Sequence, residues 1–266
     1  MIKDKNLPHA IFLDIDGTLM ESAGAASIIY GEIPERNKKA ILKAQALGHK
    51  VLINTGRGYA CLPEACFDKS ITFDGFITGL GSYVEVDGKT VFRNDISDKA
   101  LDEILEYVLS NKLCCRFHGK YKRIYADPEK RIPTLWEWID SKESFYEMLG
   151  DDRISKITID RNLSGEYLEF LSQRLEVYRH SPVIGEAVSA GCSKSRGMML
   201  ALEALGIPTE RSIAMGDSIN DTDVLRAAGT AVAPANACDE IKSICEVVTL
   251  SDVEGGVGAA IEELLL

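Results

Sequence analysis

Three short apolar runs along the chain share one pattern: each is continuous rather than alternating, and each ends abruptly in polar residues. The runs are residues 10–13, 51–53 and 213–215, the last of which continues a strand that begins at Ser212. Strands that are buried on both faces of a parallel sheet have this composition, because neither face meets water. Between the first two runs, residues 35–47 place apolar side chains at helical spacing, after Pro34 and before Gly48. The order strand, helix, strand predicts a right-handed crossover that brings two strand ends to one edge of a sheet.

The pattern changes near residue 82, where alternation replaces the continuous apolar runs. Residues 83–92 alternate around Asp87-Gly88, the dipeptide of a type I′ turn, and predict a β-hairpin. A helix with a single apolar stripe is expected after Asp98. Further short strands and a helix are expected up to about residue 188. Hairpins mixed with helices are typical of an α+β domain of ordinary size.

Parallel alternation returns at Ser193, where a helix is expected over residues 196–205, before the strand at 212–215. The sequence therefore predicts an α/β fold: a doubly wound, mostly parallel, Rossmann-like core sheet with an inserted α+β domain. We expect the core to comprise residues 1–81 and 189–266, and the insert to comprise residues 82–188.

Composition narrows the class of protein. The 266 residues are 45% hydrophobic and 27% charged, as in ordinary globular domains, and no apolar run is long enough to span a bilayer. The seven cysteines contain no Cys-x-x-Cys pair, which favours reduced thiols and a cytoplasmic location over a disulfide framework or a zinc site. A net charge of −11 argues against nucleic acid as a partner.

Polar clusters follow three of the predicted parallel strands. They are Asp14 with Asp16, Thr55-Gly56-Arg57, and Gly216-Asp217 through Asp221. Because the carboxyl ends of parallel strands open on one ligand crevice, four aspartates should converge there. Converging carboxylates repel one another and resist burial unless a cation balances them. Their oxygen ligands predict Mg²⁺, and Lys194 is the expected second cation.

The segment Asp14-Ile15-Asp16-Gly17-Thr18 resembles the first motif of the haloacid dehalogenase-like (HAD) phosphohydrolases. The other three motifs follow in the order of that family, at Thr55-Gly56-Arg57, at Lys194 and at Gly216-Asp217. The segments around Lys194 and Asp217, and residues 232–237, are similar to the Cof-type sugar-phosphate phosphatase branch. The insert lies where that branch carries a type-two cap. The resemblance covers the whole predicted core.

The resemblance implies the catalytic and metal-binding roles. Asp14 would be the nucleophile, and Asp16 would be the general acid and base. Magnesium would be held by Asp14, by the backbone carbonyl of Asp16 and by Asp217. A carboxylate is a weak nucleophile, but a covalent intermediate divides a difficult hydrolysis into two easier steps.

The resemblance also implies a phosphate-binding set. Thr55 and the amide of Gly56 would bind phosphate oxygens, and Lys194 would neutralise both the nucleophile and the phosphate. Asn220 is expected to contact phosphate as well. Asp221 would lie behind these groups and orient Lys194 or a metal-bound water.

Together these roles imply a Mg²⁺-dependent phosphatase that hydrolyses small phosphate monoesters, such as sugar phosphates or related metabolites, through an aspartyl-phosphate. A phosphomutase or phosphotransferase with the same intermediate is an alternative, as is a non-catalytic binding protein on the same scaffold. The sequence predicts neither the substrate nor the oligomeric state. Two features depart from the Cof-type pattern: Asn54 replaces a small residue, and Gly79-Leu80-Gly81-Ser82 replaces an Asn-Gly segment.

Overall fold

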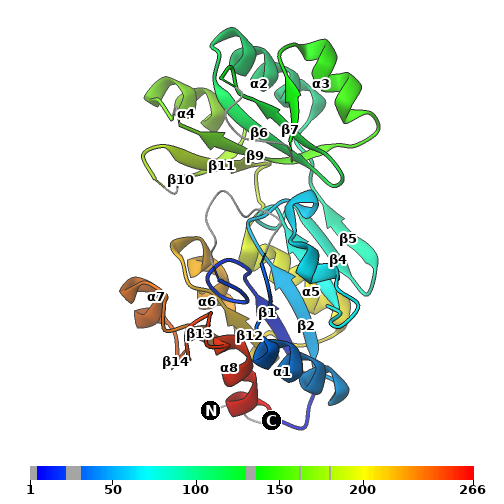
Figure 1. Ribbon diagram of the computed structural model, residues 1–266, viewed down its shortest axis with the longest axis vertical. Helices are drawn as coiled ribbons and strands as arrows, with labels where there is room; N and C mark the ends of the chain where they lie inside the picture. Colours follow the sequence, from blue (N-terminus) through cyan, green and yellow to red (C-terminus); the bar gives the residue numbers. More distant parts are fainter. Residues whose placement is uncertain (1–4, 22–30, 130–135, 162, 180) are drawn as a thin grey trace. The chain divides into compact units, whose positions relative to one another are not determined.

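The computed structural model describes residues 5–21, 31–129, 136–161, 163–179 and 181–266 (Figure 1). The chain forms two compact units. Unit 1 comprises Met1–Gly56, Leu62–Phe92 and Ser193–Leu266, and unit 2 comprises Arg57–Cys61 and Arg93–Cys192. No helix in the described ranges combines the length and the apolar character needed to cross a membrane.

Unit 1 is built on an eight-stranded sheet in the order β14-β13-β12-β1-β2-β3-β4-β5 (Figure 1). Its strands are β1 (Ala10–Leu13), β2 (Lys50–Asn54), β3 (Gly75–Thr78), β4 (Tyr83–Val86), β5 (Lys89–Arg93), β12 (Ser212–Met215), β13 (Thr230–Ala233) and β14 (Val247–Val248). The pairs from β14 to β3 are parallel. The chain leaves β1 toward β2 and later returns beside β1 as β12, so the strand order reverses next to β1. A crevice for ligands forms at the carboxyl ends of strands at such a reversal.

Within the described ranges, unit 1 also contains five α-helices: α1 (Glu35–Ala46), α5 (Lys194–Leu205), α6 (Thr222–Ala227), α7 (Asp239–Ile244) and α8 (Gly256–Leu264). Residues of α5, α6 and α7 form a core with Phe12 and Leu52 of the sheet. The helices α1 and α8 lie side by side (Figure 1), where the Gly258 amide donates to Asn37 Oδ1 at 2.7 Å. The mostly parallel α/β core that the sequence predicts is confirmed.

The β4–β5 hairpin belongs to unit 1, whereas the sequence analysis placed it in the insert. Strand β4 pairs antiparallel with β3, and Val84 and Val86 pack against Met198 of α5. The hairpin itself forms around Asp87 and Gly88, both at positive φ, as its turn type requires. Alternation identified the hairpin but could not show which sheet it joins. The structure accordingly divides after Phe92 and Cys192, instead of after residues 81 and 188, and it also assigns Arg57–Cys61 to unit 2.

Unit 2 contains a six-stranded sheet in the order β10-β11-β9-β6-β7-β8. Its elements are α2 (Asp98–Ser110), β6 (Cys114–Gly119), β7 (Arg123–Ala126), β8 (Glu137–Ile139), α3 (Lys142–Leu149), β9 (Ile154–Asp160), α4 (Gly165–Ser172), β10 (Glu176–Arg179) and β11 (Ile184–Val188). The three helices cover one face of the sheet (Figure 1), where Phe117, Phe145 and Tyr167 belong to one apolar core. Because strand residues alternate between faces, Arg116 and His118 lie on the other face.

Candidate active site

The first predicted motif forms a tight turn at the end of β1. Asp14 is 5% exposed, and its amide donates to the Met215 carbonyl of β12 at 3.0 Å. The turn closes where the Leu19 amide donates to the Asp14 carbonyl at 3.2 Å. Gly17 adopts φ +75°, and a Cβ there would lie 2.6 Å from Asp217 Oδ2. Only glycine therefore lets this turn approach the fourth motif so closely.

The second motif follows β2 at the same edge of the sheet. Because Leu13 pairs with Ile53 in parallel register, Asp14 and Thr55 emerge on neighbouring strands. Thr55 is buried, its amide donates to the Ile77 carbonyl at 2.9 Å, and its carbonyl accepts from the Leu80 amide at 3.4 Å. Gly56 comes next and is partly exposed.

The helix α5 places Lys194 at the centre of the site. It starts at Lys194, two residues earlier than expected, because the Ser193 hydroxyl caps it by accepting from the Arg196 amide at 3.1 Å. Lys194 is 1% exposed, and its Nζ lies 2.9 Å from Asp14 Oδ1 and 2.6 Å from Asp221 Oδ1. Burial opposes the ammonium charge, but the two carboxylates outweigh burial and hold the pKa of Lys194 above its usual range.

The fourth motif folds around Asp221. Its Oδ2 accepts hydrogen bonds from the amides of Asp217 and Ser218, both at 3.2 Å, while its Oδ1 contacts Lys194. Asp221 thus fixes both the lysine and the loop that carries Asp217. Asn220 accepts a hydrogen bond from Ser218 Oγ at 2.6 Å through its Oδ1, so its carbonyl oxygen is engaged within the loop.

Negative charge exceeds positive charge among these side chains. Burial, together with the neighbouring carboxylates, raises the pKa of Asp14 to about 7 despite the attraction of Lys194. Burial and the charge of Asp221 raise the pKa of Asp217 to about 6. Raised pKa values that one buried lysine does not offset are typical of carboxyl groups at a site that a further cation completes.

Mg²⁺ fits this set of donors. Carboxylate oxygens of Asp14, Asp217 and Asp221 all lie within 4.8 Å of one another. Asp221 already contacts Lys194 and two amides, so Asp14 and Asp217 are the better-placed side-chain ligands of the three. Asp16 is partly exposed and lies two residues after Asp14 in the same turn. Hard oxygen donors of this kind suit Mg²⁺, which is usually held by one or two carboxylates.

Three residues that the sequence analysis assigned no role support the predicted ones. Thr18 Oγ1 donates to Asp217 Oδ1 at 2.9 Å, and Asn236 Nδ2 donates to the Gly17 carbonyl at 2.7 Å. Asn54 Nδ2 donates to the Lys194 carbonyl at 3.1 Å. Thr18 and Asn236 lie within segments that resemble the family, but their partners are about 200 residues away along the chain, and no local pattern identifies such partners.

The second departure from the Cof-type pattern has a backbone explanation. Gly79, Leu80 and Gly81 adopt φ values of +57°, +55° and +79°. At Gly81, an added Cβ would overlap the carbonyl of Ser193, the residue that caps α5. This segment therefore brings the chain against the start of the helix that carries Lys194.

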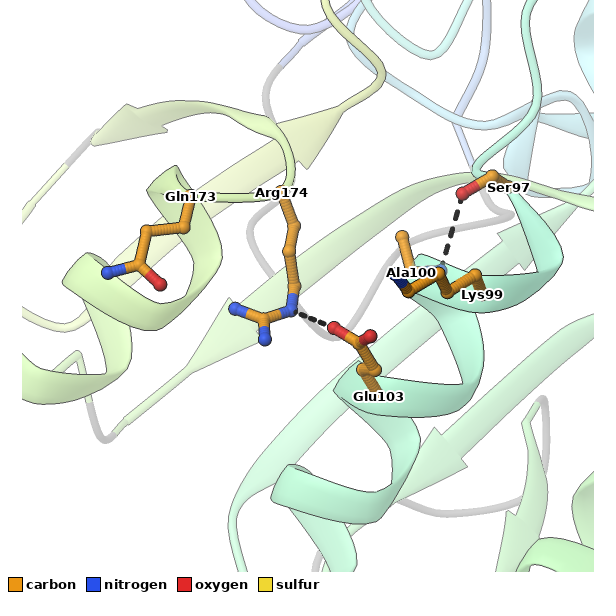
Figure 2. A pocket seen from close by; sticks show the side chains of 6 residues that line it. All are labelled: Ser97, Lys99, Ala100, Glu103, Gln173 and Arg174. Atoms are coloured by element: carbon orange, nitrogen blue, oxygen red, sulfur yellow. Dashed lines mark hydrogen bonds and ion pairs between the residues drawn. The ribbon is translucent and has the colours of Figure 1, made fainter.

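A separate hollow lies between α2 and α4 in unit 2 (Figure 2). Its volume is about 270 Å³, and its lining includes Lys99 and Arg174. Arg174 Nε lies 2.7 Å from Glu103 Oε2, an ion pair drawn in Figure 2, and the Arg174 guanidinium stacks 3.8 Å from the centre of the Phe170 ring. Arg174 therefore already interacts with Glu103 and Phe170. None of the predicted site residues lines this hollow.

Comparison with known proteins gives matches over nearly the whole chain. A family model described as haloacid dehalogenase-like hydrolase matches residues 11–261. The 5-amino-6-(5-phospho-D-ribitylamino)uracil phosphatase YcsE of Bacillus subtilis is 27% identical over 265 residues, covering 96% of this chain and 95% of that protein. A haloacid dehalogenase-like hydrolase structure from B. subtilis has a TM-score of 0.76 at 25% identity, covering 97% of this chain and 100% of that one. The subclass IIB sugar phosphatase BT4131 shares the fold, with a TM-score of 0.74 at 23% identity, covering 96% and 98%.

Proposed function

The chain belongs to the haloacid dehalogenase-like hydrolase family, and on this premise we propose that it is a Mg²⁺-dependent phosphatase. It hydrolyses small phosphate monoesters through an aspartyl-phosphate on Asp14. One observation carries the proposal: the buried Asp14 carboxylate lies 2.9 Å from Lys194 Nζ, in a site where carboxylates outnumber cations. An excess of buried carboxylates lowers the stability of the protein. It is useful in a site that binds an anionic phosphate together with a metal cation.

In the first step an oxygen of Asp14 attacks phosphorus. The bond between phosphorus and the ester oxygen breaks as the new Asp14–phosphorus bond forms. Asp16 gives its proton to the departing oxygen, so that an alcohol leaves rather than an alkoxide. Lys194, held by Asp221 at 2.6 Å, reduces the repulsion between the attacking carboxylate and the phosphate.

In the second step Asp16 acts as a base. It accepts a proton from a water molecule whose oxygen attacks the phosphorus of the aspartyl-phosphate. The Asp14–phosphorus bond breaks, inorganic phosphate forms, and the Asp14 carboxylate is restored. Thr55, the Gly56 amide, Lys194 and Asn220 bind the phosphate oxygens throughout.

The metal would be held by Asp14, by the backbone carbonyl of Asp16 and by Asp217, whose carboxylate Thr18 orients. When bound, Mg²⁺ supplies positive charge to the phosphoryl oxygens. This role agrees with the pKa values of Asp14 and Asp217, which burial and the neighbouring carboxylates raise although Lys194 opposes the rise.

Sugar phosphates and related phosphorylated metabolites are the proposed substrates. The name of the relative YcsE assigns to that protein a phosphate ester on a ribityl chain, and the structural relative BT4131 is described as a sugar phosphatase. Both are phosphate esters of polyhydroxylated alkyl groups, whose alkoxides are poor leaving groups. Such substrates need the general acid that Asp16 would supply.

The test is a panel of phosphorylated metabolites with free inorganic phosphate as the measured product. Mg²⁺ should be required, and EDTA should abolish turnover. Asp217→Ala should remove Mg²⁺ binding, measured by calorimetry, while Asp239→Ala, a change at an exposed aspartate of the same unit, should leave binding unchanged. Unaltered Mg²⁺ affinity in Asp217→Ala would overturn the metal assignment, and transfer of phosphate to a second sugar without release would identify a phosphomutase.

A further inference from the structure

A five-residue segment, Arg57–Cys61, belongs to unit 2 although the chain on both sides of it belongs to unit 1. We call these five residues the strap. The strap contains a single turn of 3₁₀ helix, Tyr59–Cys61, and it follows directly after Thr55 and Gly56. Its position in the chain therefore joins the proposed phosphate-binding turn to the other unit.

The residues before the strap are fixed within unit 1. The Thr55 amide donates to the Ile77 carbonyl of β3 at 2.9 Å, and the Thr55 carbonyl accepts from Leu80 at 3.4 Å. Asn54, one residue earlier, is bound to the Lys194 carbonyl. Gly56 is the single residue between this anchored end and the strap.

The strap itself is held on β6 of unit 2. Cys61 Sγ lies 3.5 Å from His118 Nδ1, and Lys120 Nζ lies 5.3 Å from the centre of the Tyr59 ring. At Gly58 the backbone is so close to β6 that an added Cβ would lie 2.8 Å from His118 Cβ. The strap also closes on itself, because Cys61 donates its amide to the Gly58 carbonyl at 2.8 Å and accepts from Arg57 Nη1 at 3.1 Å.

His118 is a rigid support for the strap. Its side chain is 5% exposed, and its Nε2 lies 2.9 Å from Thr158 Oγ1 of the neighbouring strand β9. Burial, followed by the charge of Lys156, lowers the pKa of His118 well below its usual value, and burial raises the pKa of the Cys61 thiol. Both partners are therefore neutral near pH 7, and the contact does not depend on a charge that salt could screen.

We propose that Gly58 and His118 are positioning residues for the phosphate-binding turn: by holding the strap on β6, they fix how Thr55 and Gly56 meet a phosphate. The inference rests on the proposed function. Gly56 joins an end that is anchored on the sheet of unit 1 to a strap that is anchored on β6, so a shift of the strap changes the backbone dihedrals at this junction. Glycine permits such rotation, and its amide turns with it. By reciprocity, phosphate bound at the turn must stabilise the strap on β6.

The test places a methyl group between the strap and β6. Gly58→Ala should displace the strap without changing any group that touches phosphate or metal. Inorganic phosphate should then inhibit hydrolysis of p-nitrophenyl phosphate about tenfold less tightly, while Mg²⁺ affinity stays as in the wild type. Gly165→Ala is the matched control, because an added Cβ at Gly165 meets nothing within 4 Å in the same unit. A purely structural role of Gly58 would lower thermal stability and leave phosphate inhibition unchanged.

Hydrogen exchange gives a second readout that needs no turnover. In the wild type, Mg²⁺ with inorganic phosphate should slow amide exchange in residues 57–61 and 114–119 as well as in residues 50–55. In Gly58→Ala only residues 50–55 should keep this protection. If Gly58→Ala does not fold, Cys61→Val removes the contact with His118 and should weaken phosphate inhibition in the same way, whereas Cys61→Ser keeps a hydrogen-bonding group and should retain most of it.

The outcomes separate the two proposals. A wild-type protein that does not hydrolyse p-nitrophenyl phosphate with Mg²⁺ would refute the proposed function, and the role of the strap with it. An active wild type beside a folded Gly58→Ala, or its replacement Cys61→Val, with unchanged phosphate inhibition and unchanged exchange protection would overturn the strap inference alone.

Discussion

Buried charged side chains are arranged differently at the two sheets of this protein. On the polar face of the six-stranded sheet, buried charges form matched pairs: Arg116 Nε lies 2.8 Å from Asp160 Oδ2, and Lys156 pairs with Glu186. At the carboxyl ends of the eight-stranded sheet, the carboxylates of Asp14, Asp217 and Asp221 surround Lys194, the one ammonium recorded among them in the described part of the chain.

The difference separates charges that build a domain from charges that prepare a site. A matched buried pair adds little net stability, but removal of one partner leaves an uncompensated charge in the interior. An unmatched set destabilises the protein from the start, and each carboxylate that is removed relieves repulsion. Single neutralising substitutions should therefore have opposite effects on the stability of the two units.

The largest expected effect is on activity in unit 1. Asp14→Asn removes the proposed nucleophile and should reduce turnover on the order of 10⁴-fold or more for every substrate. The same change should raise the metal-free free energy of unfolding by about 1 kcal/mol, because one repelling charge disappears. Steady-state kinetics and denaturant unfolding measure the two effects. If Asp14→Asn without metal were less stable than the metal-free wild type, the carboxylates of unit 1 would not form an unmatched, repelling set.

Asp16 sharpens the comparison, because it is partly exposed where Asp14 is buried. Asp16→Asn should slow release of a sugar alcohol by about 10³-fold, and release of p-nitrophenol much less, because nitrophenolate leaves without a proton. Rapid mixing with p-nitrophenyl phosphate should show a burst of about one equivalent per site, since hydrolysis of the aspartyl-phosphate is slow without a base. Equal losses on both esters without a burst would remove Asp16 from the acid–base role.

In unit 2, the removal of one charge from a buried ion pair should lower the free energy of unfolding. Arg116→Met leaves Asp160 buried without its partner and should cost about 3 kcal/mol at pH 8. The cost should shrink at pH 5, because burial already raises the pKa of Asp160 and the unpaired carboxyl can then take up a proton. The double variant Arg116→Met with Asp160→Leu should recover most of the loss. Denaturant unfolding at both pH values measures these differences. An Arg116→Met variant with an unchanged free energy of unfolding would contradict the idea that matched buried charges depend on one another.

The smallest effect is the response of the metal-free protein to acid. The pKa values of Asp14 and Asp217 are raised to about 7 and about 6, so the folded state binds more protons than the unfolded state between about pH 4 and 7. Unit 1 should therefore gain stability as the pH falls through this range. The pKa of His118 is lowered, mainly by burial, so at this residue the unfolded state binds more protons below about pH 6.5, and His118 should reduce the stability of unit 2 there, whereas the raised pKa of Asp160 acts in the opposite direction.

Each group should contribute at most about 1.4 kcal/mol per pH unit. Native-state hydrogen exchange of β1 and β6, corrected for the intrinsic dependence of exchange on pH, resolves the two units separately. His118→Gln should weaken the pH dependence of exchange from β6 and leave the pH dependence of exchange from β1 unchanged. An unchanged pH dependence of exchange from β6 in His118→Gln would contradict the assignment.

The sequence predicts the strand ends well because that information is local. Continuous apolar runs mark β1, β2 and β12, and the polar residues after each run lie at one edge of one sheet, as expected. The family resemblance identified Lys194, and the structure brings it into contact with Asp14 and Asp221. Membership of the haloacid dehalogenase-like family is likewise confirmed by the match over residues 11–261.

What the sequence does not predict depends on contacts between distant segments. The alternation of residues 83–92 is the same whether the hairpin extends one sheet or the other, and only packing on α5 decides between them. The contact of Asn236 with Gly17 spans 219 residues, and that of Cys61 with His118 spans 57. A short polar side chain has no periodicity that reveals such a partner.

The β4–β5 hairpin also provides one edge of the eight-stranded sheet. An open sheet presents unpaired backbone groups at its edges, and a long apolar edge strand invites pairing with a second molecule. At one edge of the eight-stranded sheet, β5 exposes Lys89 and Thr90 beside Val91, and an approaching strand would have to desolvate the lysine. At the other edge, β14 has only two residues, Val247 and Val248. Both edges are thus poor templates for β-aggregation, which protects a sheet whose interior strands are almost entirely apolar.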